Sequence, residues 1–254
     1  MSSVSISLGE VAASLALIAL AAAVSFWQRA GLEKDIGVAV VRSFLQLTAV
    51  GYVIQAIFDS DSLWLVTALL AAMVAFGAFT ARGRAKAVPG AIGPILLALS
   101  AAAAVTLGLV LVLGVFDPEP RYLVPVGGMV IGNSMTAVAV TLNRLADEMH
   151  DGRRQIEAML ALGATAHQAA RGIVSRSLRS GMIPLVDSTK TTGVVFFPGT
   201  MVGMLVAGAE PVEAVRLQLV LLWVLLGAVA LSGLIAVSLG YRGFFTPAHQ
   251  LRDT

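Results

Sequence analysis

Residues 144–180 read RLADEMHDGRRQIEAMLALGATAHQAARGIVSRSLRS, and they form the one long polar interval of an otherwise apolar chain. Within it, Ile156, Met159 and Leu160 recur at helical spacing, and Gly163 is expected to end that helix as a C-terminal cap. A capping-box pattern starting at Thr165 predicts the beginning of a second helix. Because apolar segments flank this helix–glycine–helix unit, we expect an exposed docking surface between membrane spans.

The composition places the chain of 254 residues in a membrane. Hydrophobic residues make up 57% and charged residues 13%, and the mean hydropathy is +0.87, which excludes an ordinary soluble domain. The absence of cysteine excludes disulfides and thiolate metal sites. We therefore expect one membrane domain over residues 1–254, with a cytoplasmic loop at about 144–180.

Apolar runs of about 20 residues are long enough to cross a bilayer as helices. We expect seven such spans, which makes the fold class all-α and polytopic, at 8–26, 37–58, 63–79, 90–115, 122–142, 181–208 and 212–239. A cleaved signal peptide is the alternative interpretation of the first run. No Lys or Arg precedes that run, which favours a retained span.

Basic residues gather in alternate loops. One set of loops carries Arg29, Lys34, Arg82, Arg84, Lys86, Arg144, Arg153, Arg154, Arg171, Arg176, Arg179, Arg242 and Arg252. The opposite loops carry Asp59, Asp61, Asp117, Glu119 and Glu210, with Arg121 and Arg216 as their bases. The positive-inside rule then predicts an outside N-terminus, a cytoplasmic C-terminus and a cytoplasmic 144–180 loop. This bias explains the basic pI without a nucleic-acid partner, since no aromatic residues are interleaved with the charges.

The predicted span 181–208 contains groups that a lipid-facing helix avoids. Asp187 and Lys190 lie one turn apart and can pair. A charge at mid-bilayer costs about 2.5–3.5 kcal/mol on insertion scales, so the pair is expected either to line a pathway or to lie at the interface, with Lys190 reaching the headgroups. The remaining candidates for a translocation pathway are Asn133, Ser188, Thr189, Pro198 and Gly199.

Asn133 falls inside the span 122–142, where an interhelical hydrogen bond is the commoner role of an amide and lining a pathway is the alternative. Small residues recur every fourth position at 128 and 132, and again at 199, 203 and 207. That spacing permits close helix packing within a subunit or across a dimer. Oxygen ligands from Asp187, Asn133 and the nearby hydroxyls suit a hard cation, although the residues that hold a metal ion are not identified.

The segment Glu157-Ala158-x-x-x-x-Gly163-Ala164 resembles the cytoplasmic coupling motif of ABC-transporter permeases. Wider segments resemble the iron-export permease family, which includes bacterial FetB-type proteins and plant permeases linked to aluminium tolerance. These segments are Gly132-Asn133-Ser134-Met135, Asp187-Ser188-Thr189-Lys190 and Pro198-Gly199-Thr200-Met201-Val202-Gly203. The resemblance covers nearly the whole chain, with Thr200 as a departure where a more apolar or smaller residue is expected.

This resemblance implies a homodimer in the bacterial inner membrane, served by a separate ATPase chain. The ATPase would dock on Glu157, Ala158, Gly163 and Ala164 and would bind the ATP and Mg²⁺. This chain has no G-x-x-x-x-G-K-[ST] phosphate loop, so it is expected to hold no cofactor and not to be an enzyme itself.

Two classes of function follow. The first is an ABC permease that exports iron or a similar metal ion, with an organic solute such as a sugar nucleotide as the alternative substrate. The second is a carrier or channel that works alone and uses Asp187 and Lys190 as a coupling pair. A membrane-embedded enzyme is disfavoured because the sequence shows neither clustered acids nor metal-ligand spacing.

Overall fold

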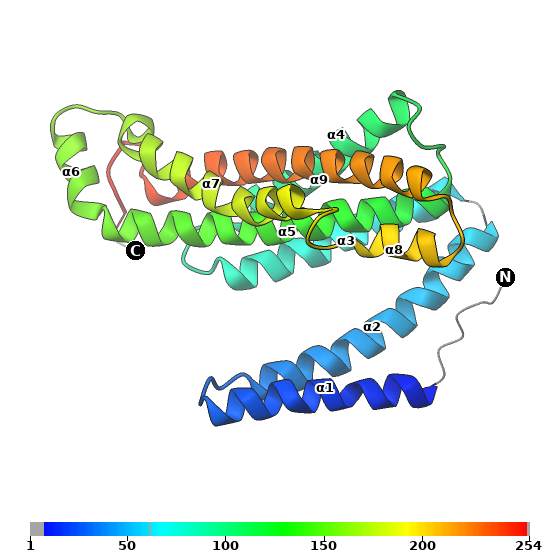
Figure 1. The fold of residues 1–254 in the computed structure, drawn as a ribbon. Helices are drawn as coiled ribbons and strands as arrows, with labels where there is room; N and C mark the ends of the chain where they lie inside the picture. The colour runs from blue at the N-terminus through cyan, green and yellow to red at the C-terminus, as the bar shows by residue number, and fades with distance from the viewer. Residues whose placement is uncertain (1–7, 61, 253–254) are drawn as a thin grey trace.

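The computed structural model describes residues 8–60 and 62–252, so Asp61 of the predicted acidic turn lies outside the described residues. Within them every regular element is helical (Figure 1), which confirms the predicted all-α class. The helices are α1 (Leu8–Trp27), α2 (Glu33–Ser60), α3 (Leu63–Arg84), α4 (Ile92–Val112), α5 (Pro120–Asp151), α6 (Arg153–Ala161), α7 (Ala166–Thr191), α8 (Gly199–Val206), α9 (Pro211–Gly240) and the 3-10 helix η1 (Tyr241–Phe244).

Among the described residues, six helices, α1 to α5 and α9, are long and apolar enough to cross a membrane. The predicted span 181–208 is not one helix. Helix α7 ends at Thr191 and α8 begins at Gly199. Gly193, between them, has a φ of +86°, which favours glycine, and Pro198 has no backbone N–H for a continuing helix. The charged and hydroxyl-rich end of α7 also makes that helix more polar than the other long helices.

The core of the bundle lies among α3, α4, α5, α7 and α9, where side chains such as Leu99, Leu142 and Val237 are completely buried. Glycine lets these helices approach closely. A Cβ atom on Gly181 of α7 would lie 2.7 Å from the carbonyl oxygen of Ala137 in α5. The backbones of α5 and α7 therefore pack against each other with no room for a side chain at this crossing.

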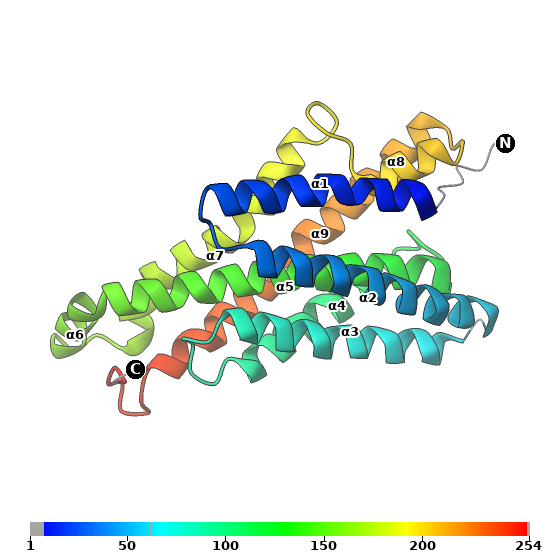
Figure 2. The same ribbon diagram turned by 90° about the horizontal axis from the view of Figure 1, so that it is seen from below.

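The connections gather at two ends of the bundle (Figures 1 and 2). The α1–α2 and α3–α4 turns, α6 and the C-terminal segment lie at one end. The α2–α3, α4–α5 and α8–α9 turns lie at the other. Helix α7, the loop after it and α8 together run from one end of the bundle to the other. The predicted span 181–208 is therefore broken into two helices, but the basic and acidic loops still alternate between the two ends. The orientation in the membrane stays a prediction.

Helices α1 and α2 form a hairpin that diverges from the rest of the bundle toward the α6 end (Figure 1). Its turn is closed by Ser25, whose Oγ donates a 2.7 Å hydrogen bond to Glu33 Oε1. At the opposite end, Ile57 of α2 packs with Val66 of α3 and Val124 of α5. Helix α2 is therefore fixed to the bundle mainly at one end.

Candidate coupling helix and transmembrane pathway

The polar interval folds into the predicted helix, glycine turn and second helix. Helix α6 is followed by Gly163, which has a φ of +90°. The backbone N–H of Gly163 donates to the carbonyl oxygen of Leu160, and that of Ala164 donates to the carbonyl oxygen of Met159. This pair of bonds is a Schellman-type ending, in which the left-handed glycine satisfies the last carbonyl groups of the helix.

Helix α7 begins with the predicted capping box. Thr165 Oγ1 accepts a hydrogen bond from the backbone N–H of Gln168, and the side chain of Gln168 accepts one from the backbone N–H of Thr165. Two backbone donors at the start of the helix are satisfied in this way. The turn between α6 and α7 is thus defined on both sides by local hydrogen bonds.

The residues of the predicted coupling motif lie on the outer side of this unit. Glu157, Ala158 and Gly163 are exposed and Ala164 is half-buried. Leu162, at the tip of the turn, exposes 89% of its surface. On the opposite side of α6, Ile156 is 1% exposed and packs into the main core. Helix α6 is therefore anchored by one face and presents the other.

A three-residue ionic cluster fastens α7 to α5 directly beside α6. Glu148 is 9% exposed, and its two oxygens accept hydrogen bonds from Arg144 Nε at 2.9 Å and from Arg176 Nε at 2.6 Å. Glu148 and Arg176 come from different helices, so the cluster crosslinks them. This crosslink was not predicted from the sequence. The four-residue spacing of Arg144 and Glu148 indicates their ion pair within α5, but no spacing indicates the contact of Glu148 with Arg176.

The C-terminal segment 244–252 folds back against the α6–α7 turn. Phe245 and Leu251 form an isolated β-bridge, and His249 Nδ1 accepts a 3.4 Å hydrogen bond from the backbone N–H of Ala166. Between this segment and α6 lies a cavity of about 380 Å³, whose wall includes Glu157 and Leu160. The exposed surface around the α6–α7 turn therefore has two sides, one from α6 and one from the C-terminal segment.

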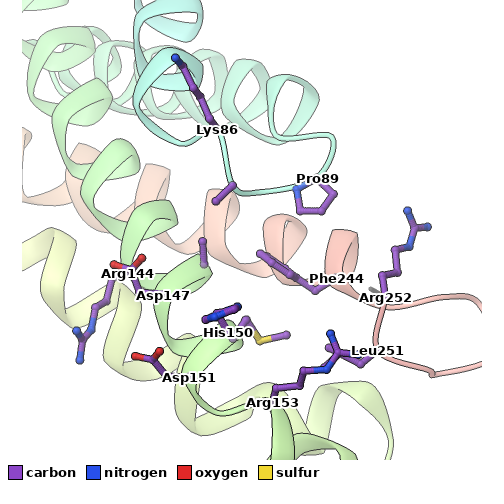
Figure 3. Close-up of a pocket in the computed structure, with 13 residues that line it drawn as sticks. Lys86, Pro89, Arg144, Asp147, His150, Asp151, Arg153, Phe244, Leu251 and Arg252 are labelled. Atoms are coloured by element: carbon purple, nitrogen blue, oxygen red, sulfur yellow. The ribbon is translucent and has the colours of Figure 1, made fainter. Parts of the chain in front are cut away.

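A larger cavity of about 710 Å³ lies beside it, between the end of α5, the α3–α4 connection and the C-terminal segment (Figure 3). His150, Asp151 and Arg153 line it from α5 and α6, and Phe244 and Leu251 line it from η1 and the C-terminal segment. The charges around it are mixed in sign. This end of the bundle thus offers a broad, hollowed and polar surface rather than a single exposed helix.

Asp187 and Lys190 form the predicted ion pair, with 3.3 Å between Lys190 Nζ and Asp187 Oδ1. Their side chains are 62% and 70% exposed on the protomer. They lie in the last turns of α7, just before the break that separates it from α8. The pair is therefore on the outer surface of a single chain and not inside its helical core.

Asn133 and Ser188 meet in a small cavity of about 160 Å³ between α5, α7 and α9, which Pro184 also lines. Asp187, Lys190, Thr189, Pro198 and Gly199 do not line it. The side-chain amide of Asn133 donates a 2.8 Å hydrogen bond to the carbonyl oxygen of Met129 in its own helix. The hydrogen bond that the Asn133 side chain donates is therefore within its own helix, whereas the sequence predicts a hydrogen bond to another helix.

The other predicted pathway residues have local roles on the protomer. Thr189 Oγ1 donates to the carbonyl oxygen of Leu185 at 2.7 Å. Pro198 caps the start of α8 and Gly199 is its first residue. A Cβ atom on Gly199, Gly203 or Gly132 would meet no atom within 4 Å. The small residues at these positions thus do not mediate close packing within one chain.

Among the described residues, no group of three or more His, Asp or Glu side chains could hold a metal ion. The polar groups of the candidate pathway are hydroxyls, one amide and the Asp187–Lys190 pair. A metal ion bound by these groups of a single chain would therefore have at most one carboxylate ligand, that of Asp187.

Comparison with known proteins gives a family match over residues 8–245, to the model described as "Uncharacterised protein family (UPF0014)". The chain is 41% identical to "UPF0014 membrane protein STAR2" of Oryza sativa subsp. japonica over 95% of this chain and 85% of the relative. It is 39% identical to "Protein ALUMINUM SENSITIVE 3" of Arabidopsis thaliana, covering 95% of this chain and 88% of the relative.

A bacterial relative matches over nearly its whole length. The chain is 36% identical to "Probable iron export permease protein FetB" of Escherichia coli (strain K12), over 99% of this chain and 97% of the relative. No solved structure matches the chain.

Proposed function

The chain belongs to the UPF0014 family of multi-pass membrane proteins, and from that premise we propose that it is the membrane-spanning permease subunit of an ABC transporter. A separate ATPase chain binds the ATP and Mg²⁺ and drives it. The observation that carries this proposal is α6, a short helix anchored at one end of the bundle through the buried Ile156. Its outer face presents Glu157 and Ala158 to solvent.

The docking surface consists of α6, the α6–α7 turn and the adjoining C-terminal segment. Leu162 supplies an exposed apolar contact at the tip, and Gly163 sets the direction of the turn with its positive φ. A partner that binds this surface pushes on a unit whose inner face is fixed to α5 and α7. The surface thus has the properties that a coupling element needs: exposure on one side and rigid attachment on the other.

The proposed substrate is iron or a similar metal ion, which the chain exports. The support is the FetB relative, named as an iron export permease and matched over nearly the full length of both chains. The candidate pathway groups are Asn133, Asp187, Ser188 and Thr189, with Lys190 as the partner of Asp187. Their oxygen atoms suit a hard cation.

The working unit is proposed to be a homodimer in the bacterial inner membrane. A charged pair that faces lipid is costly, and such groups in membrane proteins normally face protein or water. Since Asp187 and Lys190 are mostly exposed on one protomer, a second copy that covers this face would enclose them. The pathway then lies between two α5–α7 faces, and the break before α8 lies beside it.

The transport reaction is tested with inside-out vesicles that contain this chain and its co-encoded ABC ATPase. Export then becomes accumulation, and iron is expected to accumulate only when both chains and ATP are present. ATP hydrolysis by the two chains without movement of iron would support the permease proposal but would exclude iron as its substrate. Iron flux in proteoliposomes that contain this chain alone would instead support a stand-alone carrier or channel.

Docking is tested by co-purification of the ATPase with single-site variants. Ala158→Lys places a charged, longer side chain on the exposed face of α6 and is expected to abolish capture. Ser175→Lys, at an exposed position of α7 ten residues beyond Thr165 that does not line the cavity beside α6, is the matched control and should retain capture. Equal capture by both variants would remove α6 as the docking element.

A further inference from the structure

The divergence of α2 from the bundle leaves a cavity of about 550 Å³ between α2, α3 and α5, which we call the α2 wedge. Its walls come from the first half of α2, the second half of α3 and the middle of α5. Ile57 fixes α2 to the bundle at the other end, and α2 lies progressively farther from the bundle toward the end that carries α6 (Figure 1). It is separate from the small cavity that holds Asn133 and Ser188.

Glycine gives the wedge its depth on the α5 side. Gly128 and Gly132 both line it. A Cβ atom on Gly132 would meet nothing within 4 Å, and one on Gly128 would meet only Met73 Cε, at 3.3 Å. The four-residue spacing that suggested helix–helix packing thus serves a cavity wall here. Met73, Phe76 and Met135 complete an apolar surface beside the glycines.

Polar groups face this apolar wall from α2 and α3. Arg42 and Gln46, one turn apart on α2, line the wedge together with Arg84 at the end of α3. Arg42 lies nine residues beyond Glu33, which is about 13 Å along the helix axis. Within residues 8–60 and 62–252, neither guanidinium group has a hydrogen-bond or ion-pair partner. Asp35 also lines the wedge but is not paired with either arginine.

We infer that the α2 wedge binds one anionic phospholipid from the membrane leaflet at the α6 end. The phosphate lies between Arg42 and Arg84, and Gln46 donates to its oxygens. One acyl chain lies along Met73, Phe76 and the surface opened by the glycines of α5. Arg42 lies within the predicted span 37–58, where an unpaired charge is costly, and Arg84 lies in the predicted basic loop that follows the span 63–79. Guanidinium groups bind phosphate with paired, charge-assisted hydrogen bonds.

The charge balance favours a singly charged headgroup. Arg42, Arg84 and Asp35 together carry a net charge of +1, which a single phosphodiester neutralises. A zwitterionic lipid would bring an additional cation next to the two arginines. Basic pockets between membrane helices are a recurrent way to hold anionic lipid headgroups. The site therefore discriminates by headgroup charge, while the apolar wall requires an attached chain.

The test measures thermal unfolding of the purified full-length protein in a neutral detergent. Phosphatidylglycerol, phosphatidylcholine or glycerol 3-phosphate is added in increasing amounts. Only phosphatidylglycerol is expected to raise the midpoint temperature. The paired change Arg42→Gln and Arg84→Gln is expected to raise the half-saturating lipid concentration by at least about tenfold, because charge-assisted hydrogen bonds are lost.

Two further variants separate binding from folding. Arg82→Gln removes a neighbouring arginine of α3 that lines a different cavity, and it should leave the lipid response unchanged. Gly132→Leu fills the open wall of the wedge without removing a charge, and it should weaken the response to phosphatidylglycerol. The inference would be overturned if phosphatidylcholine or free glycerol 3-phosphate raised the midpoint temperature as much as phosphatidylglycerol does. It would also be overturned if the Arg42→Gln and Arg84→Gln variant responded to phosphatidylglycerol as the unmodified protein does.

Discussion

The Glu148 cluster is the attachment whose loss should weaken the link between α5 and α7 most directly. Glu148 is 9% exposed, whereas Arg144 and Arg176 are 51% and 62% exposed. Hydrogen bonds to charged groups contribute about 1.5–3 kcal/mol when they are shielded, and exposed ion pairs about 0.2–1 kcal/mol. Because Glu148 is buried and both arginines are exposed, we expect each arginine–Glu148 interaction to contribute about 1 kcal/mol to the free energy of unfolding, between these two ranges.

Glu148→Gln keeps the shape of the side chain but removes its charge, and it is expected to lower the free energy of unfolding by about 2 kcal/mol. In a chain of this size that corresponds to a fall of about 4–8 °C in the midpoint temperature of thermal unfolding. The measurement is a thermal melt of the purified protein in detergent. Arg153→Gln, which breaks the exposed Arg153–Glu157 pair of α6, serves as the comparison and should change the midpoint much less.

A double-mutant cycle isolates the interaction between the two helices. If Glu148 and Arg176 bind each other as described, the double variant Glu148→Gln and Arg176→Gln should be about 1 kcal/mol less destabilised than the sum of the single variants. The corresponding cycle for Arg153 and Glu157 should give less than about 0.5 kcal/mol. Additive effects at Glu148 and Arg176 would refute the crosslink, even if Glu148→Gln alone were destabilising.

Three further predictions concern single positions. Gly181→Val should strongly reduce the yield of folded protein, because the valine side chain would meet the α5 backbone at Ala137. Gly132→Ala should be tolerated, because its methyl group points into open space. Size-exclusion chromatography of the detergent-solubilised protein measures the yield of both variants. Gly163→Ala should lower the melting temperature by about 2–8 °C, since a left-handed residue other than glycine costs about 1–2 kcal/mol. Gly83→Ala, within α3, is its control. Asp187→Asn should leave the melting temperature within about 1–2 °C, because its exposed pair contributes about 0.5 kcal/mol at most, yet abolish ATP-driven transport; unchanged transport would remove Asp187 from the pathway.

Features that depend on neighbouring residues could be predicted from the sequence, because the interactions that define them are local. Thr165 and Gln168 are three residues apart, and their capping box forms as expected. The left-handed turn at Gly163 is likewise set by the last turn of α6. The all-α membrane class follows from composition alone, since a long apolar segment in lipid must satisfy its backbone hydrogen bonds within a helix.

Features that depend on how helices pack could not be predicted in the same way. Glu148 and Arg176 are 28 residues apart, and only the contact of α5 with α7 brings them together. Gly132 and Gly181 look alike in the sequence, yet one faces a cavity and the other the α5 backbone. Apolar residues resume after Gly193, and the apolar content of 181–208 therefore predicts one continuous span. The glycine and Pro198 end one helix and begin another despite that apolar content.

The position of α7 gives the proposed coupling a physical basis. The helix begins one residue after Thr165, at the end of the docking turn, and continues for 26 residues, or about 39 Å, to the region of Asp187 and Lys190. Arg176, ten residues beyond Ala166, ties the helix to α5 near the middle of its length, so a displacement of α6 acts on a helix that is held and not free to rotate. Pro184 removes one backbone hydrogen bond within the helix and marks the place where it bends most easily. Since Pro184 lines the same cavity as Asn133 and Ser188, bending there would change the candidate pathway first.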